Sequence, residues 1–473
     1  MASQEEITPL VGQHQQYASQ NRHWGKVKKK TMLMRSMLAL SLLFALAGGV
    51  WALQHLFHQS PITKKPLPDF SSLRGYCAHT QAIQPNEYIK RQKKLAATLP
   101  ESSAYVMEGG PTMLYYTNIA WGLSERPFLV VLVADASQPG GIKTTVVTPM
   151  FEATRAVEAV KDANLPDEIQ PDIVEWIEHG SPYTVTADQV LANISTVFVE
   201  PTTRLFIFDG LSQVLENGVN GQGKGVQVAS RALQTLRMVK SPAELNILRC
   251  VNHATEEAIR QVRPHVNVGM TESDIATLMT RALTTAGLTN TWVLALVDEN
   301  AAFPHGEPGT TKKVGKDSTV LIDTGGELLG YQSDTTRTFF LGNREDHNQT
   351  IVDAWYLVKR AQKNVLDLGH AGSSCAEIDL SARRIITTAG YGRYFTHRLG
   401  HGLGMEMHEE PYMNQGNTDQ ALEVGMTFSV EPGIYVPREF GIRLEDIVVV
   451  NEEGQLEVLT SGLADNPWTL RDE

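Results

Sequence analysis

The chain has 473 residues, of which 42% are hydrophobic and 20% are charged, and this is typical of a globular protein with two or more domains. Its net charge of −12 argues against nucleic acid as the main partner and is compatible with the binding of metal cations. Three cysteines exclude a disulfide-dense scaffold, and no spacing among them resembles a zinc finger. Their odd number leaves at least one thiol free or paired between chains, and we expect isolated thiols at Cys77, Cys250 and Cys375.

The N-terminal end is predicted to form a tail, a membrane anchor and a stalk. Residues 1–31 are polar and end in a basic run, KVKKK. The segment 32–57 contains an uncharged apolar run, and roughly 20 such residues are needed to cross a bilayer. Because the basic residues lie on its N-terminal side, we expect a single-pass protein with a cytoplasmic tail and a lumenal or extracellular body. Prolines in the segment 58–79 indicate a short, stiff stalk.

The apolar run has two other interpretations, a cleaved signal peptide and a buried helix of a globular domain. The long polar region before it disfavours the first, and the one-sided flanking charge disfavours the second. Two sequons, at Asn193 and Asn348, are the expected glycosylation sites of a translocated body. Because such triplets are frequent by chance, each is weak support for translocation.

Residues 80–225 alternate between helical and strand patterns, which predicts an α/β domain. The apolar run 127–134 lacks alternation and is typical of a strand buried on both faces. Helices are predicted over 87–99 and 151–160, and further strands over 112–118, 144–147 and 206–208. No catalytic constellation lies in this part, and the glycine-rich segment 217–225 indicates a boundary loop.

Residues 226–473 are predicted to form an α+β domain with a mostly antiparallel sheet. Three helix starts carry a Ser or Thr followed three residues later by an acidic residue, at Ser241, Thr271 and Ser374. A long helix is predicted over 349–368, and two other helices are expected to end at Gly287 and Gly390. Strands are predicted over 292–297, 319–323, 331–341, 427–435 and 442–450, with a turn at Gly325-Gly326.

Four acidic residues lie in or at the ends of strands that otherwise have the composition of a core, namely Asp323, Asp334, Glu431 and Glu445. Buried charges are costly unless they are paired or bind a metal, and the alternative for each carboxylate is a salt bridge. His401 adds an imidazole within the glycine-rich stretch GHGLG, where the backbone can approach an ion closely. Oxygen ligands with one imidazole suit Mn²⁺ or Zn²⁺, and four anionic ligands suit two ions that share a water or hydroxide.

Five motifs, in this order, carry a resemblance to a known family: FPHG, LIDTGGELLGYQSDTTRTF, HRLGHGLGMEMHEEP, SVEPGIY and IRLED. They resemble the pita-bread metallopeptidases, which include methionine aminopeptidase, aminopeptidase P, prolidase and creatinase. The segment YYTNIAWGLSERPFLVVL is similar to the creatinase-type N-terminal domain of the Xaa-Pro enzymes, which methionine aminopeptidases lack. The resemblance covers roughly 85–470 and implies a pita-bread catalytic domain preceded by a creatinase-type α/β domain.

The resemblance implies a dinuclear metal site at the matching positions. Asp323 would hold one ion, and Asp334 and Glu445 would bridge both ions. His401 and Glu431 would complete the second position, and Glu431 would also take the proton of the bridging water. The expected cofactor is two divalent ions, Mn²⁺ in the first place, with Zn²⁺ or Co²⁺ as alternatives.

The resemblance also implies residues on the substrate side. His305 and His408 match the histidines that stabilise the tetrahedral intermediate or assist the leaving nitrogen. His397 matches a histidine that lines the substrate pocket, and Arg443 matches an arginine that supports the site and the substrate. A structural ion pair is the alternative interpretation of Arg443.

The resulting expectation is a metallopeptidase that hydrolyses the Xaa-Pro bond at peptide N-termini. The alternative activity is that of an Xaa-Pro dipeptidase, and the short segment between Glu431 and Glu445 favours the aminopeptidase. Two alternatives are a pita-bread binding module that has lost its metals and a creatinase-like hydrolase that works without them. The complete set of metal ligands disfavours both alternatives. A homodimer is possible, and the sequence does not decide the oligomeric state.

Overall fold

The computed structural model describes residues 67–216 and 225–469. The predicted tail 1–31, the predicted anchor 32–57 and residues 58–66 of the predicted stalk lie outside the described residues. Among the helices of the described ranges, none combines the length and the apolar character that crossing a membrane requires. Contacts divide the chain into two units, Met1–Pro68 and Asp69–Glu473, and all described helices and strands belong to the second.

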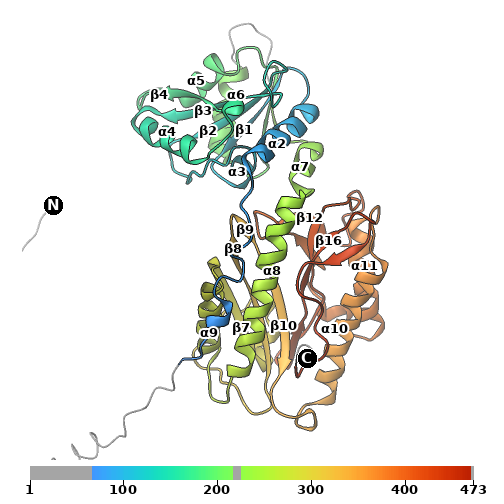
Figure 1. Cartoon of the computed structure of the whole chain (residues 1–473). Coiled ribbons are helices and arrows are strands. Elements are labelled where there is room, and N and C mark those ends of the chain that lie inside the picture. The colour runs from blue at the N-terminus through green and yellow to red at the C-terminus, as the bar shows by residue number, and fades with distance from the viewer. Residues whose placement is uncertain (1–66, 217–224, 470–473) are drawn as a thin grey trace, which may run out of the picture. The chain divides into compact units, whose positions relative to one another are not determined.

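The first domain is built on a six-stranded sheet (Figure 1). Its strands are β1 Ser103–Glu108, β2 Leu129–Ala134, β3 Ile142–Pro149, β4 Asp172–Trp176, β5 Thr196–Val199 and β6 Gly225–Val228. Its helices are α2 Pro85–Thr98, α3 Pro111–Thr117, α4 Ala153–Asp162, α5 Pro182–Gln189, α6 Leu205–Glu216 and α7 Arg231–Met238. The strand order is β4-β3-β2-β1-β5-β6, with β2 antiparallel to both neighbours. The sheet therefore extends to Val228, beyond the predicted boundary at 225.

Strand β2 confirms the prediction for the apolar run 127–134. Val130 and Leu132 face one hydrophobic cluster, and Leu129 and Val131 face another on the opposite side of the sheet. Both faces of this strand are therefore covered, which explains why its sequence lacks a polar alternation. Hydrophobic clusters on both faces of the sheet are typical of the α/β domain that the sequence predicts for this part of the chain.

Two predicted strands of this domain are helical. The segment 112–118 lies in α3, where Pro111 occupies the first turn and Asn118 ends the helix in the left-handed region at φ 53°. The segment 206–208 lies in α6, which buries Ile207, Leu211 and Leu215 at helical spacing. Both predictions were wrong because short apolar runs do not distinguish a strand from a buried helix turn.

The second domain has three antiparallel sheets and four long helices. Its helices are α8 Pro242–Val262, α9 Glu272–Thr285, α10 Gln349–Leu368 and α11 Cys375–Thr388. Its strands are β7 Thr289–Val297, β8 Thr319–Leu328, β9 Tyr331–Gln332, β10 Thr335–Phe340, β11 Gly400–Gly402, β12 Glu409–Met413, β13 Thr427–Val430, β14 Gly433–Val436, β15 Phe440–Arg443, β16 Asp446–Val450 and β17 Leu456–Val458. Capping boxes at Ser241, Thr271 and Ser374 confirm the predicted helix starts.

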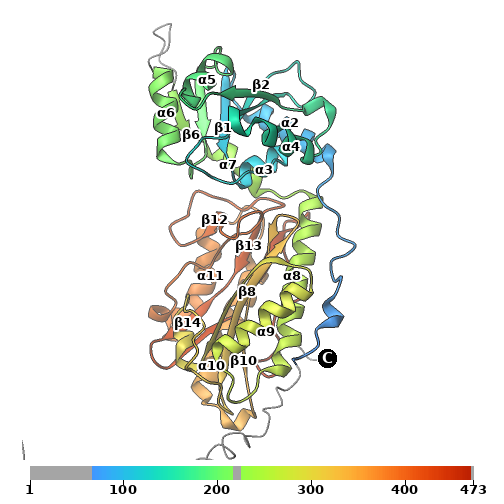
Figure 2. The same ribbon diagram turned by 90° about the vertical axis from the view of Figure 1, so that its left-hand side faces the viewer.

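The three sheets lie between two pairs of helices (Figure 2). One sheet has the order β10-β8-β7 with β9 on β8, the second has the order β12-β11-β13-β16-β17, and β14 pairs with β15. Helices α8 and α9 pack against the first sheet, and α10 and α11 pack together on the other side. This is the pita-bread arrangement that the sequence motifs imply.

The predicted turn at Gly325-Gly326 is wrong, because β8 continues through both glycines to Leu328. The turn lies at Leu329 and Gly330, which have φ values of 51° and 84°. Gly325 serves another purpose, since a Cβ atom there would lie 1.9 Å from the carbonyl oxygen of Ser333. The glycine thus permits the close approach of the strand that carries Asp334.

A disulfide joins Cys77 to Cys250 in α8, across 173 residues of sequence. The expectation of isolated thiols is therefore wrong for this pair, and Cys375 is the free, buried cysteine. Phe70 and Leu73, beside the short 3-10 helix η1 (Ser71–Leu73), are buried in the core of the second domain. The segment that precedes the first domain is thus attached to the second domain, which no sequence spacing could indicate.

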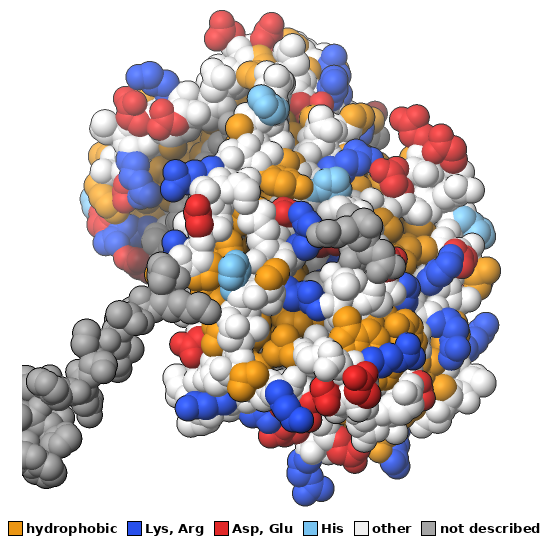
Figure 3. Space-filling model, turned by 60° about the horizontal axis from the view of Figure 1, so that its bottom comes forward, with side chains coloured by type: hydrophobic (Ala, Val, Ile, Leu, Met, Phe, Trp, Pro, Cys, Tyr) orange, Lys and Arg blue, Asp and Glu red, His pale blue; other side chains and the backbone are white. Residues whose placement is uncertain are grey.

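On the face in Figure 3, Lys and Arg side chains are interspersed with Asp and Glu side chains. A mixed surface of this kind lacks the basic field by which proteins attract nucleic acid.

Replacement of Cys77 or Cys250 by serine should lower the free energy of unfolding by about 2–4 kcal/mol, because the crosslink restricts the unfolded chain. Urea titration followed by circular dichroism measures the change. A reducing agent should destabilise the wild type and leave the Cys250→Ser variant unaffected. Equal stability of the oxidised and reduced wild type would contradict the role of the crosslink.

Candidate metal centre and active site

Asp323 and Asp334 come from neighbouring antiparallel strands. Asp323 lies within β8, opposite Thr336 of β10, and Asp334 immediately precedes β10. The pairing of β8 with β10 thus places the two carboxylates beside each other at the inner surface of the domain. The strands predicted over 319–323 and 331–341 contain this antiparallel pair, although the turn between them lies at Leu329 and Gly330.

Glu431 and Glu445 are brought together by a second antiparallel pair. Val430 at the end of β13 lies opposite Asp446 at the start of β16, so the next residues, Glu431 and Glu445, face each other where the pair ends. Next to β13 runs β11, whose central residue is His401. The donors therefore come from three stretches of the chain, 323–334, 401 and 431–445, that are distant in sequence.

The glycines around His401 allow a close approach of neighbouring protein segments, whereas the sequence suggested an approach to an ion. A Cβ atom on Gly400 would lie 1.9 Å from the carbonyl oxygen of Ser429, and one on Gly402 would lie 2.3 Å from that of Glu410. Only glycine allows β11 to pass so close to both neighbouring segments. This close packing holds His401 against the carboxylates.

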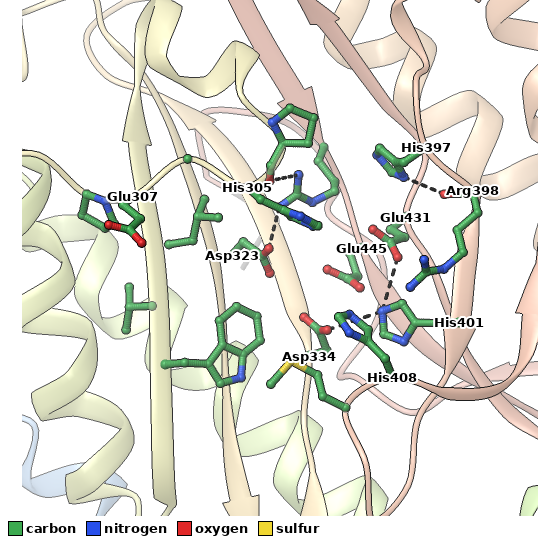
Figure 4. A pocket seen from close by; sticks show the side chains of 18 residues that line it. His305, Glu307, Asp323, Asp334, His397, Arg398, His401, His408, Glu431 and Glu445 are labelled. Carbon is green, nitrogen blue, oxygen red and sulfur yellow. Dashed lines mark hydrogen bonds and ion pairs between the residues drawn. The ribbon is translucent and has the colours of Figure 1, made fainter. Parts of the chain in front are cut away.

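The ligand atoms of the predicted donors lie in three overlapping groups, each within 4.8 Å. The groups are Asp323 with Asp334 and Glu445, His401 with Glu431 and Glu445, and Asp334 with His401 and His408. Figure 4 shows these side chains converging on one space. His401 Nε2 lies 3.4 Å from Glu431 Oε1 and 3.7 Å from Asp334 Oδ2.

The donors fit divalent cations. One oxygen of each of three buried carboxylates, those of Asp323, Asp334 and Glu445, has no hydrogen-bond partner. A buried carboxylate oxygen without a partner is strongly unfavourable unless a cation occupies the space beside it. Four carboxylates and one imidazole are also the ligand chemistry that Mn²⁺ and Zn²⁺ accept.

The pKa values show how unfavourable the cluster of charges is. Burial, followed by the charge of Glu445, raises the pKa of Asp334 well above its ordinary value. Burial likewise raises the pKa of Glu445, and it raises the pKa of Glu431 to about 7. Burial lowers the pKa of His401 to about 3, so its imidazole is neutral and free to act as a ligand.

Arg443 is engaged by protein groups. Its Nη2 donates to Asp323 at 2.5 Å, its Nη1 to the Tyr435 hydroxyl at 2.9 Å, and its Nε to Thr336 Oγ1 at 3.0 Å. Thr336 in turn donates to Glu445 Oε2 at 2.7 Å. Arg443 therefore orients two of the predicted metal ligands, and these hydrogen bonds serve the site rather than the substrate.

The three predicted substrate-side histidines line the same cavity, which has a volume of about 360 Å³. His305 and His408 are exposed to it, and the ring of His408 lies 4.3 Å from that of His401. His397 is half-buried and fixed by two contacts, from Nε2 to the Tyr435 hydroxyl at 2.8 Å and from Nδ1 to its neighbour's carbonyl oxygen at 2.6 Å. Burial lowers the pKa of His397 to about 3.

Sequence reasoning missed two residues that line this cavity, Trp292 and Arg398, and one behind its wall, Tyr435. Trp292 contributes to an apolar wall, Tyr435 links His397 to Arg443, and Arg398 brings a second guanidinium to the cavity. Arg398 follows the predicted site residue His397 in the motif HRLGHG, and this adjacency was the only sign in the sequence that it lies at the cavity. Which way its side chain points depends on the tertiary structure.

Comparison with known proteins shows the family of this chain. Residues 246–452 match the model of "Metallopeptidase family M24". An uncharacterized peptidase of Schizosaccharomyces pombe is 39% identical to this chain, over 82% of the chain and 84% of the relative. The chain belongs to metallopeptidase family M24.

Other M24 peptidases resemble the chain over most of their length. The Xaa-Pro dipeptidase of Lactobacillus helveticus is 31% identical over 72% of this chain and 89% of the relative. The crystal structure of dipeptidase PepE from Mycobacterium ulcerans superposes with a TM-score of 0.72 at 27% identity, over 82% of this chain and all of that one. Membership of the M24 family makes the chain a metallopeptidase, and the family uses divalent metal ions.

In the metal-free protein, Asp334→Asn should raise the melting temperature at pH 7. The raised pKa of Asp334 means that the folded state holds a proton that the unfolded state releases. The free energy of unfolding therefore falls as the pH rises from about 4 towards the raised pKa, and the amide removes this loss.

The measurement is thermal melting at pH 4 and pH 7 with a chelator and then with Mn²⁺. In chelator, the increase in melting temperature caused by Asp334→Asn should be larger at pH 7 than at pH 4. With Mn²⁺, Asp334→Asn should lose the stabilisation that the ion confers on the wild type. Asp188→Asn, at an exposed position, is the matched control. If Asp334→Asn melts at a lower temperature than the wild type in chelator at pH 7, the claim that the buried charge of Asp334 destabilises the metal-free protein is wrong.

Proposed function

We propose that this chain is a metal-dependent exopeptidase that hydrolyses the bond preceding proline in short peptides. The observation that carries the proposal is the group of buried, partnerless carboxylate oxygens beside His401, at the wall of a cavity with three histidines. The name of the Lactobacillus helveticus relative supports the choice of Xaa-Pro substrates. Because the bond before proline is a tertiary amide, a dedicated site for it is chemically reasonable.

The proposed metal ligands are the residues that the sequence indicated. Asp323 would belong to one position, His401 and Glu431 to the other, and Asp334 and Glu445 to both. We expect Mn²⁺, with Zn²⁺ or Co²⁺ as alternatives. Two such ions, when bound, supply a Lewis acid for the scissile carbonyl group and lower the pKa of water towards neutrality.

The residues of the chain provide the proton transfers and the orientation. Glu431 has the most exposed side chain of the four carboxylates, so it is the one best placed to accept a proton from the attacking water and pass it to the leaving nitrogen. Burial lowers the pKa of His408, which keeps its imidazole neutral at pH 7 and able to donate one hydrogen bond to a developing oxyanion. His305 faces the same space, and His397, held by Tyr435, forms the adjoining wall.

The two other function classes have less support. A binding module without metals would have no need for four buried carboxylates, which are costly when nothing compensates them. A metal-free amidine hydrolase meets the same objection. The complete set of five donors therefore favours the peptidase over both alternatives.

We further propose that the catalytic body lies in the lumen or outside the cell, attached by the predicted anchor 32–57. The disulfide between Cys77 and Cys250 supports this, because such bonds persist in oxidising compartments. Asn193 and Asn348 are both exposed, as glycosylation requires. The anchor itself remains a prediction from the sequence.

Asp334→Ala and His401→Ala should each reduce the hydrolysis of Ala-Pro by more than about 1000-fold, since a bound metal ion contributes several kcal/mol to transition-state stabilisation. Both variants should keep the fold, as circular dichroism can verify. The assay is proline release by the full chain with Mn²⁺, with Asp188→Ala as a control. Near-normal turnover in either variant would refute the assignment of the site.

Full-length protein expressed in eukaryotic cells should shift in gel mobility on treatment with an N-glycosidase. The shift should shrink stepwise in Asn193→Gln and Asn348→Gln and vanish in the double variant. An unshifted wild type with a C-terminus accessible to cytosolic protease would reverse the proposed orientation.

A further inference from the structure

The cavity contains two guanidinium groups, those of Arg443 and Arg398, and they differ in their hydrogen bonds to the protein. Arg443 directs its donors to Asp323, Tyr435 and Thr336. The Nε atom of Arg398 is buried and has no hydrogen-bond partner. Within residues 67–216 and 225–469, no acidic side chain forms an ion pair with Arg398. A buried donor without an acceptor is costly, so a role for Arg398 beyond the packing of the chain is expected.

The position of Arg398 is well defined. Its guanidinium carbon lies 4.9 Å from the centre of the Tyr412 ring, and its carbonyl oxygen contacts His397 Nδ1 at 2.6 Å. Figure 4 shows its side chain on the side of the cavity that carries Glu431 and His401. The aromatic ring and the backbone contact thus hold a positive charge at the wall of the active site.

The metal site does not account for this charge. Cations in the carboxylate cluster would be repelled by a neighbouring guanidinium, so Arg398 weakens the binding of the ions that the cluster favours. An anionic group of the substrate would instead gain from it, because guanidinium binds carboxylate by paired, charge-assisted hydrogen bonds. In a dipeptide, the free carboxylate belongs to the residue that directly follows the scissile bond, and one residue spans about 3.5 Å.

We propose that Arg398 binds the free carboxylate of the substrate residue after the scissile bond, which makes the enzyme selective for dipeptides. This inference rests on the proposed Xaa-Pro exopeptidase function. It favours the dipeptidase over the aminopeptidase that the short segment between Glu431 and Glu445 suggested. In a longer peptide, a neutral amide takes the place of the carboxylate and leaves the guanidinium unpaired.

The test compares Ala-Pro with its C-terminal amide and with Ala-Pro-Ala, using the full chain loaded with Mn²⁺. We expect the wild type to hydrolyse Ala-Pro with a kcat/KM about 10- to 100-fold above that for the amide, the range of a charged hydrogen bond. Arg398→Gln should lower kcat/KM for Ala-Pro by a similar factor, mainly through KM. It should leave the amide and the tripeptide unchanged, so that the selectivity disappears.

Two further variants sharpen the test. Arg398→Lys keeps the charge and loses the paired geometry, so it should restore part of the preference for Ala-Pro. Arg384→Gln, at an exposed arginine outside the cavity, should match the wild type with every substrate. Metal content and melting temperature of each variant establish that the fold and the ions are retained.

The failures of the two proposals are distinguishable. If the wild type hydrolyses none of the three peptides with any divalent ion, the proposed function is wrong. If it hydrolyses the amide and the tripeptide as well as Ala-Pro, or if Arg398→Gln slows all three substrates equally, the function stands and the role of Arg398 is refuted.

Discussion

The mutual repulsion of four closely packed carboxylates is the constraint on which this structure depends. Asp323, Asp334 and Glu445 each keep a buried oxygen without a partner, and the pairing of Arg443 with Asp323 leaves most of the negative charge uncompensated. Buried like charges raise one another's pKa, so the cluster is unfavourable until protons or cations neutralise it. The M24 family uses divalent metal ions, and such ions would neutralise the negative charge that this cluster concentrates.

A second layer of buried groups holds the carboxylates in place against this repulsion. Thr336 donates to the carboxylate of Glu445, and Arg337 donates to the carbonyl oxygen of the same residue at 2.6 Å. Arg443 connects Asp323 to Tyr435, and Tyr435 holds His397. Because these contacts join strands of different sheets, the candidate metal ligands Asp323 and Glu445 and the cavity residue His397 belong to one connected network. Arg398 stands outside this network, and its free donors are therefore assigned to a group of the substrate.

Local sequence patterns succeeded where a single chemical signal decided the structure. Ser241 and Glu244 form the predicted capping box because each satisfies a backbone group of the same helix end. The patterns failed where the competing conformations share a composition, as in the segments 112–118 and 206–208. Gly325 was misjudged for another reason: its lack of a side chain serves the approach of a distant carbonyl oxygen, not a turn.

The sequence by itself indicated the family and the pita-bread fold through five motifs that resemble the pita-bread metallopeptidases. It also indicated five candidate donors, because charged residues within apolar strands are costly unless they are paired or bind a metal ion, and an imidazole among glycines accompanies them. Only the tertiary structure decided how two arginines of one cavity differ. Arg443 and Arg398 are equally cationic in the sequence, yet Arg443 is surrounded by acceptors and the buried Nε of Arg398 has none. The same holds for Cys77 and Cys250, whose pairing depends on a contact across 173 residues. Such contacts arise from the packing of distant segments, and no local spacing records them.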